Sequence, residues 1–286
     1  MKMERKRNIL GIIKSFFVST SRQFLMIFLS ITAIYPLIFM VMTALKSDEE
    51  HIFNRFGFPN SIEWANFTEV FIGRNFGLWF MNSLIITVGT VIISLGIAIL
   101  ASFALSNYKF KMRKTILSFF ISLMIVPPVV MIIPLFILMV NVNLINTYPG
   151  VIIIYTGLTL PFSIFLLSSF FRSIPYSIME SAVIDGCSSF RILTNIVLPL
   201  SIPPIVTLIV VNSLWVWNEL LIALIFLQKD KLKTLIVGIT VFKSRFDINL
   251  PLTMMGLVVI TLPILLIYLF GQKYFIKGLL SGSTKE

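Results

Sequence analysis

The sequence predicts an all-α integral membrane fold of about six transmembrane helices, and three observations support this. Of the 286 residues, 57% are hydrophobic and only 12% are charged, whereas a soluble domain carries about 25% charged residues. Six apolar runs reach the roughly 20 residues that a helix needs to cross a bilayer. Most charged residues stand between these runs. Water could not solvate so much apolar surface, so the bilayer is the expected solvent.

The six runs are long and almost free of charge. They are expected at residues 24–45, 82–106, 115–139, 149–171, 201–226 and 252–272. Prolines inside these runs or near their ends are compatible with spans, because neighbouring helices and hydroxyl side chains can satisfy the carbonyls that a proline frees. The chain is therefore expected to comprise an N-terminal arm at 1–23, a transmembrane domain at 24–272 and a tail at 273–286.

The distribution of charge predicts the orientation. The arm combines basic residues with isoleucines and phenylalanines at helical spacing, which predicts an amphipathic helix on the cytoplasmic surface. With the arm inside, the inner segments hold 15 of the 23 Lys and Arg residues and the outer segments hold 8. An excess of Lys and Arg marks the cytoplasmic side, so both termini are expected there. The net charge of +11 is thus interpreted as orientation, and no basic–aromatic groove predicts binding of nucleic acid.

Residues that could carry chemistry are scarce. Cys187 is the single cysteine, so no disulfide within the chain is expected, and its side chain fits a small apolar filler. His51 has no further ligand at metal-binding spacing, so no metal site is expected. The sequence contains no GxxxxGK[ST] pattern for binding phosphates. We therefore expect no enzyme activity and no cofactor in this chain.

Small side chains recur every three or four residues along the second run. They are Ser83, Thr87, Thr90, Ser94, Ala98 and Ala101. Such a stripe lets another helix approach closely, and a lining for a polar solute is the alternative interpretation.

The connection at 172–199 is too polar to span the membrane and too apolar for a simple linker. Ser177 and Glu180 fit a capping box at the start of a short helix. Gly186 stands where a residue with positive φ would end that helix. The sequence therefore predicts a helix of about two turns before the glycine.

A second short helix is expected after Gly186. Ser188 or Ser189 can cap its beginning, and Pro199 would close it. The apolar positions of the two helices are Ile178, Met179, Ala182 and Val183, then Phe190, Leu193 and Val197. This apolar ridge either docks on a partner or packs back onto the spans, and the pattern alone leaves both possibilities open.

Six residues of this connection resemble the "EAA" loop of bacterial ATP-binding-cassette importer permeases. They are Glu180, Ala182, Asp185, Gly186, Leu198 and Pro199. The sequence departs from that loop at Ser181, where alanine is usual, and at Cys187, where another small residue is usual. In that family the loop forms two cytoplasmic coupling helices that dock into a groove of the ATPase subunit. The resemblance implies that Glu180 pairs with a basic residue of the ATPase, that Gly186 forms the bend, and that the fold is the six-helix type I importer permease.

Several other stretches are similar to the carbohydrate, maltose-type branch of this family. They are Asn82-Ser83, Pro134-Leu135-Phe136, Asn146-Thr147, Trp217-Asn218-Glu219 and, near the end, Gln272, Phe275, Gly278-Leu279, Gly282 and Lys285. The tail departs at Ser281, Ser283 and Thr284, where small apolar residues are usual. This departure leaves open whether the tail reaches into the ATPase dimer.

A polar face is expected on the fifth run. Asn212, Trp215 and Glu219 fall within about 60° of one another on a helical wheel. One interpretation is a lining of the translocation path, with the indole stacking on a sugar ring and the polar groups binding hydroxyls. The alternative is an aromatic residue at the outer interface beside a solvated carboxylate.

The resemblance implies a permease subunit of an ATP-driven importer for a sugar or oligosaccharide, in a bacterial inner membrane. The implied partners are a second permease subunit, expected to be a different chain, two cytoplasmic ATPase subunits and an extracytoplasmic solute-binding protein. ATP would be used by the ATPases. The alternatives are an importer permease for another polar solute, such as amino acids, and an ion-coupled secondary transporter. The second alternative predicts ionisable residues at the midplane, and no run carries a charge near its centre.

Overall fold

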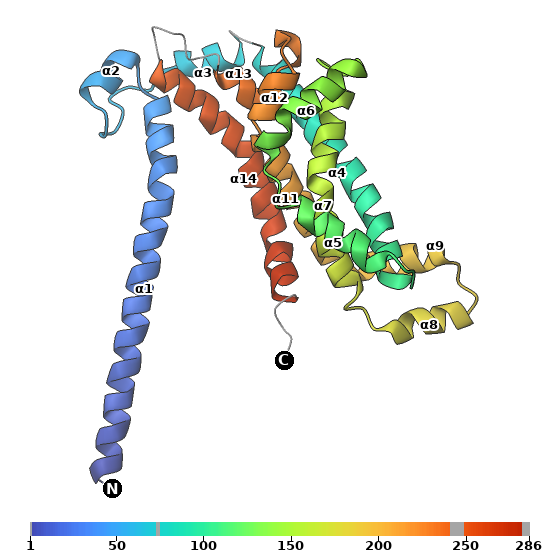
Figure 1. The fold of residues 1–286 in the computed structure, drawn as a ribbon. Coiled ribbons are helices and arrows are strands. Elements are labelled where there is room, and N and C mark those ends of the chain that lie inside the picture. Colours follow the sequence, from blue (N-terminus) through green and yellow to red (C-terminus); the bar gives the residue numbers. More distant parts are fainter. Residues whose placement is uncertain (1, 73–74, 241–248, 282–286) are drawn as a thin grey trace. The chain divides into compact units, whose positions relative to one another are not determined.

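The computed structural model describes residues 2–72, 75–240 and 249–281, and all regular elements within these ranges are helices (Figure 1). The chain divides into two compact units. The first unit comprises the chain up to Val70 together with the beginning of the last helix, up to Val258. The second begins at Phe71 and takes the rest of the last helix from Val259. Each unit is described separately below.

The first unit is built on one long helix. Helix α1 runs without a break from Lys2 to Ala44 and is followed by α2 (Asp48–Phe53) and α3 (Trp64–Phe71). Its part from Ser19 to Ala44 is long and apolar enough to cross a membrane. The helix does not end at residue 23, so the proposed border between arm and span is not a break in secondary structure.

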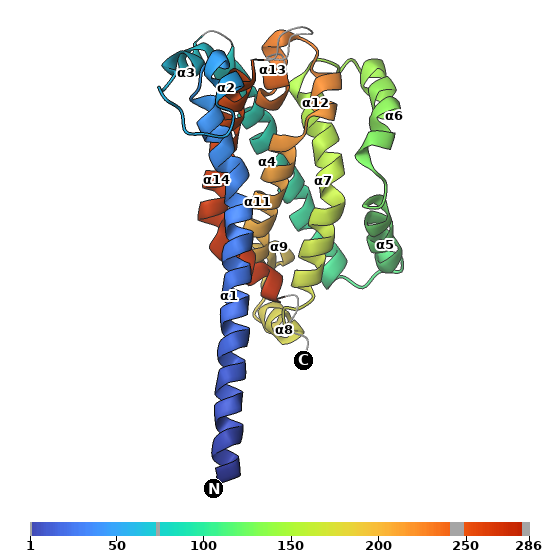
Figure 2. The ribbon, with the colours of Figure 1, turned by 90° about the vertical axis from the view of Figure 1, so that its left-hand side faces the viewer.

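The second unit contains most of the remaining helices (Figure 2). They are α4 (Phe76–Asn107), α5 (Arg113–Leu123), α6 (Pro128–Asn141), α7 (Tyr148–Phe171), α8 (Tyr176–Ile184), α9 (Ser189–Ile192), the π-helical η1 (Leu193–Val197), α10 (Leu198–Leu200), α11 (Ile202–Asn218), α12 (Leu221–Phe226), the 3₁₀ helix η2 (Asp230–Leu232), α13 (Leu235–Thr240) and the second part of α14 (Leu250–Ser281). Helices α8 and α9 lie at the end of this unit where α4 finishes, and α12 and α13 lie at the opposite end (Figure 1).

Helices α4 and α7 form the centre of this unit. The predicted stripe of small residues on α4 is buried from Ser83 to Ala98. Polar contacts cross the seam: the Thr159 hydroxyl donates to Ser94 Oγ at 2.9 Å, and Ser102 Oγ donates to the Ile164 carbonyl at 3.1 Å. The stripe therefore serves helix packing, in agreement with the first of the two interpretations.

The third predicted span is wrong as a continuous helix. The chain at 115–139 breaks after Leu123, and α5 and α6 meet at an angle of 101°. Pro127 is extended, with ψ of 132°, and neither Pro127 nor Pro128 has an N–H to continue the helical ladder. Two successive prolines thus separate two helices that the hydropathy pattern joins.

The fifth predicted span, 201–226, is also divided. Helix α11 ends at Asn218, Glu219 is extended with ψ of 119°, and α12 begins at Leu221. At the N-terminal end of α11, the segment Ser189–Leu200 meets this helix at an angle of 76°. Among the described residues, four helices are long and apolar enough to span a bilayer, and the count rises to six if each bent pair forms one span.

Candidate functional site

The predicted loop forms a hairpin of two short helices, α8 and α9, closed by a glycine. Gly186 has φ of +77°, so the predicted left-handed position is confirmed. Its N–H donates to the Val183 carbonyl at 3.0 Å, and the Cys187 N–H donates to the Ala182 carbonyl at 2.9 Å. This pair of bonds is the Schellman pattern, which satisfies the last carbonyls of a helix. A side chain at Gly186 would meet no atom within 4 Å, so only the backbone conformation demands glycine there.

The two predicted helix starts have different outcomes. Ser188 caps α9, since its side chain accepts a hydrogen bond from the Arg191 N–H at 3.3 Å, which confirms one of the two expected caps. The capping box at Ser177 is wrong. Pro175 is the N-cap of α8, which places Ser177 inside the helix, and no side chain caps this end. Glu180 is thus free of the structural role that the capping box would have given it.

The apolar ridge is divided between two environments. Met179 and Ala182 of α8 and Ile192 of α9 are buried in a cluster with α4, α7 and α11, as are Leu193 and Val197 of η1. By contrast, Tyr176, Val183, Ile184 and Phe190 are between 60% and 84% exposed. One face thus packs back onto the helices, as the second interpretation expected, while the other face is uncovered and docking on a partner stays a prediction.

A hollow of about 560 Å³ lies between the hairpin and the end of α4. Its polar lining includes the Glu180 carboxylate, Asn107, Tyr108 and Ser189. Glu180 is exposed and forms no hydrogen bond or ion pair within the described residues, and Asn107 Nδ2 is buried without a partner. A carboxylate and an amide without partners at a hollow that opens to solvent are suited to bind a polar group from another molecule.

The six predicted coupling residues lie in different environments. Glu180, Asp185, Gly186 and Pro199 are exposed, Leu198 is half-buried, and Ala182 is buried. The expectation that Pro199 closes the second helix is wrong, because the helical path continues to Leu200. The π-helical turn at Leu193–Val197 precedes the proline, and such a turn shifts the hydrogen-bond register.

The polar face of α11 is turned toward α7. Asn212 is buried, and its Nδ2 donates to Ser163 Oγ at 3.0 Å. The ring of Trp215 stands edge-to-face against Tyr155 with the ring centres 5.7 Å apart. Trp215 also borders an apolar hollow of about 450 Å³ at the break between α5 and α6. Of the three residues, Trp215 is the one that lines this hollow.

Glu219 is engaged by the protein itself. Its carboxylate accepts a hydrogen bond from the Tyr155 hydroxyl at 2.7 Å and others from the amides of Ile222 and Ala223 at 3.0 and 3.2 Å. The first amides of a helix lack partners within the helix, so the carboxylate caps α12. This capping explains why the chain leaves the helical path at Glu219 instead of continuing as one span.

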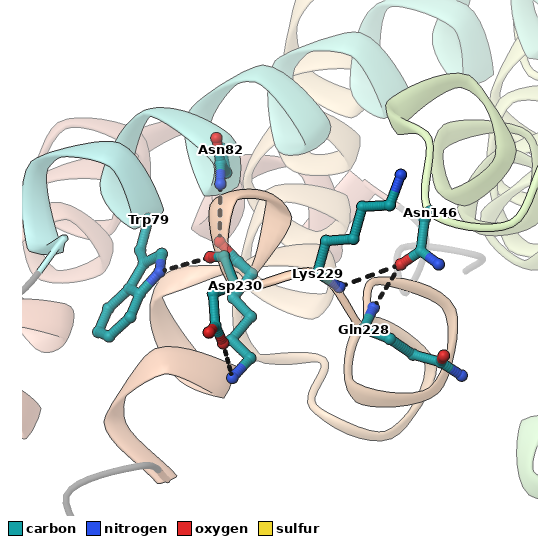
Figure 3. A network of polar contacts seen from close by, with 7 residues as sticks. Trp79, Asn82, Asn146, Gln228, Lys229 and Asp230 are labelled. Atoms are coloured by element: carbon teal, nitrogen blue, oxygen red, sulfur yellow. Dashed lines mark hydrogen bonds and ion pairs between the residues drawn. The ribbon is translucent and has the colours of Figure 1, made fainter.

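A second polar network lies at the opposite end of this unit, around the segment 228–235 (Figure 3). Asn82 Nδ2 donates to the carbonyls of Lys231 and Lys233, both at 2.9 Å, and the Trp79 indole donates to the Asp230 carbonyl at 3.0 Å. Asn146 Oδ1 accepts from the Gln228 and Lys229 amides. In the sequence, Asn82 and Asn146 are marked only by the resemblance, and an amide within the apolar run at 82–106 is a further signal for Asn82.

Similarity to known proteins shows the family of this chain. A family described as the inner membrane component of binding-protein-dependent transport systems matches residues 94–280. The chain belongs to this family. The matched range includes the α8–α9 hairpin, and the importer-permease family expected from the sequence is confirmed.

Curated relatives match over most of their length. The melibiose/raffinose/stachyose import permease of Bacillus subtilis is 33% identical over 87% of this chain and 91% of its own. The arabinooligosaccharide transport permease of the same organism is 33% identical, over 90% and 92%. The sulfoquinovosyl glycerol transport permease of Agrobacterium fabrum is 32% identical, over 90% of each.

A solved structure supports the fold. A chain of a bacterial ABC transporter that imports the acidic polysaccharide alginate superimposes with a TM-score of 0.79, covering 95% of this chain and 98% of its own at 22% identity. The chain therefore has the all-helical fold of an ABC importer permease and is a multi-pass membrane protein.

Proposed function

We propose that this chain is a permease subunit of an ATP-driven importer for a sugar or oligosaccharide, which it moves by alternating access. The α8–α9 hairpin carries the proposal, since it exposes apolar side chains and a carboxylate that has no partner among the described residues at one end of the helices. The named substrates of the relatives above, melibiose, arabinooligosaccharides and sulfoquinovosyl glycerol among them, support carbohydrate as the solute class. The chain supplies the path and leaves ATP hydrolysis to its partners.

The hairpin is proposed to be a pair of coupling helices that dock on a cytoplasmic ATPase. Ile184 and Phe190 would enter an apolar groove, while Glu180 in its hollow would accept a basic side chain. The buried face, with Met179 and Leu193, would transmit the motion to α4, α7 and α11. Docked elements can shift an equilibrium only if they bind its two states differently, so the ATPase is proposed to hold the hairpin differently in its open and closed states.

The remaining partners and the topology form part of the same proposal. The pair α5–α6 counts as one span and α11 with α12 as another, which gives six spans with both termini in the cytoplasm, where most Lys and Arg residues lie. A second, different permease subunit would cover the break between α5 and α6, because irregular backbone at membrane depth is tolerated only against protein or in a water-filled cavity. A solute-binding protein would deliver the sugar at the opposite end.

Within this path, Trp215 is proposed to contact the solute, while Asn212 and Glu219 position α7, α11 and α12. The polar atoms of Asn212 and Glu219 are already bonded within the chain, whereas the indole borders a hollow in which a sugar ring could stack. Trp215→Ala should raise the half-saturating sugar concentration for uptake several-fold while the subunits still assemble. Unchanged transport affinity in this variant would remove Trp215 from the path.

The experiment that tests the coupling role uses Gly186→Val and Glu180→Lys. A β-branched residue at the left-handed position costs about 1–2 kcal/mol and redirects α9, and lysine reverses the charge offered to the partner. Both variants should insert normally and lose either the co-purified ATPase or solute-stimulated hydrolysis in proteoliposomes. Gly96→Val is the matched control, because Gly96 lies in α4 without positive φ and with no atom within 4 Å of an added Cβ. If both variants retain coupled hydrolysis, the hairpin is only a connector.

A further inference from the structure

The turn between α4 and α5, residues 108–114, is a dense cluster of basic residues, and we call it the basic turn. It carries Lys109, Lys111, Arg113 and Lys114 within six positions. Beside and between these cations stand three exposed apolar or aromatic side chains: Tyr108 (47% exposed), Phe110 (42%) and Met112 (59%). Cationic and apolar side chains thus alternate on one exposed segment.

The cations surround an open space. A hollow of about 440 Å³ is lined by Lys109, Phe110, Lys111, Arg113 and Lys114. In the described part of the chain, none of these cations forms a salt bridge. Helix α5 begins at Arg113, and no side chain caps it, so the N-terminal end of its dipole adds positive potential. The hollow therefore attracts an anion that the protein does not supply.

The position of the basic turn selects the kind of anion. It joins two apolar helices, and none of the α5 residues is buried, so α5 and the turn lie at the periphery of this unit. Helix α8 lies beyond the end of α5 that the basic turn joins to α4 (Figure 2). The turn therefore lies closer to the apolar helices than the hairpin does, at the depth expected for lipid headgroups.

We propose that the basic turn binds the phosphate of an anionic phospholipid headgroup. Clusters of Lys and Arg directly beside a membrane span favour acidic lipids, and amphipathic aromatic side chains are favoured at the interface. Lys109 and Lys111 bind the phosphate, while Tyr108 and Phe110 lie against the upper acyl chains. This site needs only the membrane environment of the chain and does not depend on the transported solute.

The test measures binding of phosphatidylglycerol to the delipidated full-length chain in neutral detergent by native mass spectrometry. Each Lys near an anionic lipid surface contributes roughly a factor of five, so Lys109→Gln/Lys111→Gln should bind about 30-fold more weakly. Lys109→Arg/Lys111→Arg should restore binding. In the parent protein, binding should weaken as salt is raised, because the charges are screened, and this gives a second readout that needs no variant.

The matched control is Lys229→Gln/Lys231→Gln, which removes the same Lys-x-Lys pair at the opposite end of the unit. It should bind phosphatidylglycerol like the parent. Phosphatidylcholine should not compete, and free glycerol phosphate at equal concentration should not displace the lipid. The proposal is overturned by parental lipid binding in Lys109→Gln/Lys111→Gln, or by an equal loss in the control. Parental lipid binding combined with loss of the ATPase would assign the turn to an acidic protein surface instead.

Discussion

The two ends of the second unit differ in how their connecting segments are held. At the end where α4 begins, buried side chains bind the backbone of residues 228–235: Asn82 and Trp79 are 1% and 4% exposed and donate to three carbonyls there. At the hairpin end, the backbone is closed by the local turn at Gly186, while Ile184 and Phe190 are 84% and 70% exposed. At the 228–235 end the chain binds its own backbone groups, whereas at the hairpin end apolar surface stays exposed.

From this difference we infer a structural role for the 228–235 end and the proposed coupling role for the hairpin end. A segment held by long-range hydrogen bonds moves only if those bonds break, so the 228–235 end should behave as part of the helix core. The hairpin is fixed to the core by one face only. Force applied to its exposed face can therefore reach α4, α7 and α11 without first disrupting their packing.

The largest effect expected is an all-or-none difference in labelling, which decides which end faces the cytoplasm. A cysteine replacing Glu63 should react with a membrane-impermeant thiol reagent in intact cells. One replacing Lys285, which lies outside the described residues, should react only after the membrane is permeabilised. Both variants also carry Cys187→Ser, so that the native thiol gives no background. Labelling of the Lys285 position in intact cells would place the hairpin end outside and remove the coupling role.

The next largest effect is expected at Asn82. Asn82→Ala leaves the Lys231 and Lys233 carbonyls and the Tyr148 hydroxyl, which donates to Asn82 Oδ1 at 2.6 Å, without this partner. Unsatisfied buried groups cost about 1–3 kcal/mol each, so the free energy of unfolding should fall by about 3 kcal/mol. Thermal unfolding in detergent measures this, and trypsin should cut faster after Lys229, Lys231 and Lys233.

The control for Asn82 is Asn218→Ala. Asn218 is exposed and bonds only its own helix, through the Leu214 carbonyl at 2.8 Å. The free energy of unfolding of Asn218→Ala should therefore lie within about 0.5 kcal/mol of that of the parent. Equal stability of Asn82→Ala and Asn218→Ala would mean that the 228–235 segment is held by packing alone.

Features encoded within a few residues were predictable. Gly186 ends α8 with positive φ because a left-handed helix end favours a residue without a Cβ, and Ser188 caps α9 through its own side chain. The apolar spans followed from composition, and the stripe on α4 followed from helical spacing. In each case the determining interaction is local or depends only on side-chain size.

Features that depend on distant partners or on local competition were not predictable. Hydropathy continues across Glu219 and across Pro127-Pro128, so a pattern-based span passes through both breaks. The first break depends on a carboxylate that caps the next helix and binds Tyr155, which lies 64 positions away. The Asn82 network joins residues about 150 positions apart. The capping box failed because Pro175 begins α8 earlier than the Ser177–Glu180 pair.

The sharpest test of the comparison comes from two residues three positions apart, one in α9 and one at the start of η1, and the smallest stability effect is expected at the first. Leu193 is 4% exposed and packs in the core, whereas Phe190 is 70% exposed. Leu193→Ala should lower the free energy of unfolding by about 2–4 kcal/mol, because it leaves a cavity. Phe190→Ala should change it by less than about 0.5 kcal/mol and should instead reduce the amount of ATPase that co-purifies with the permease.

Opposite responses at these two positions are the result that separates anchoring from docking. Thermal unfolding of the permease alone reports the first role, and the ATPase-to-permease ratio after purification reports the second. If Phe190→Ala also unfolds several degrees earlier, its ring is part of the core and the hairpin has no free face there. If Phe190→Ala matches the parent in both measurements, the partner binds elsewhere on the hairpin, and Ile184, the most exposed of its apolar residues, becomes the position to vary next.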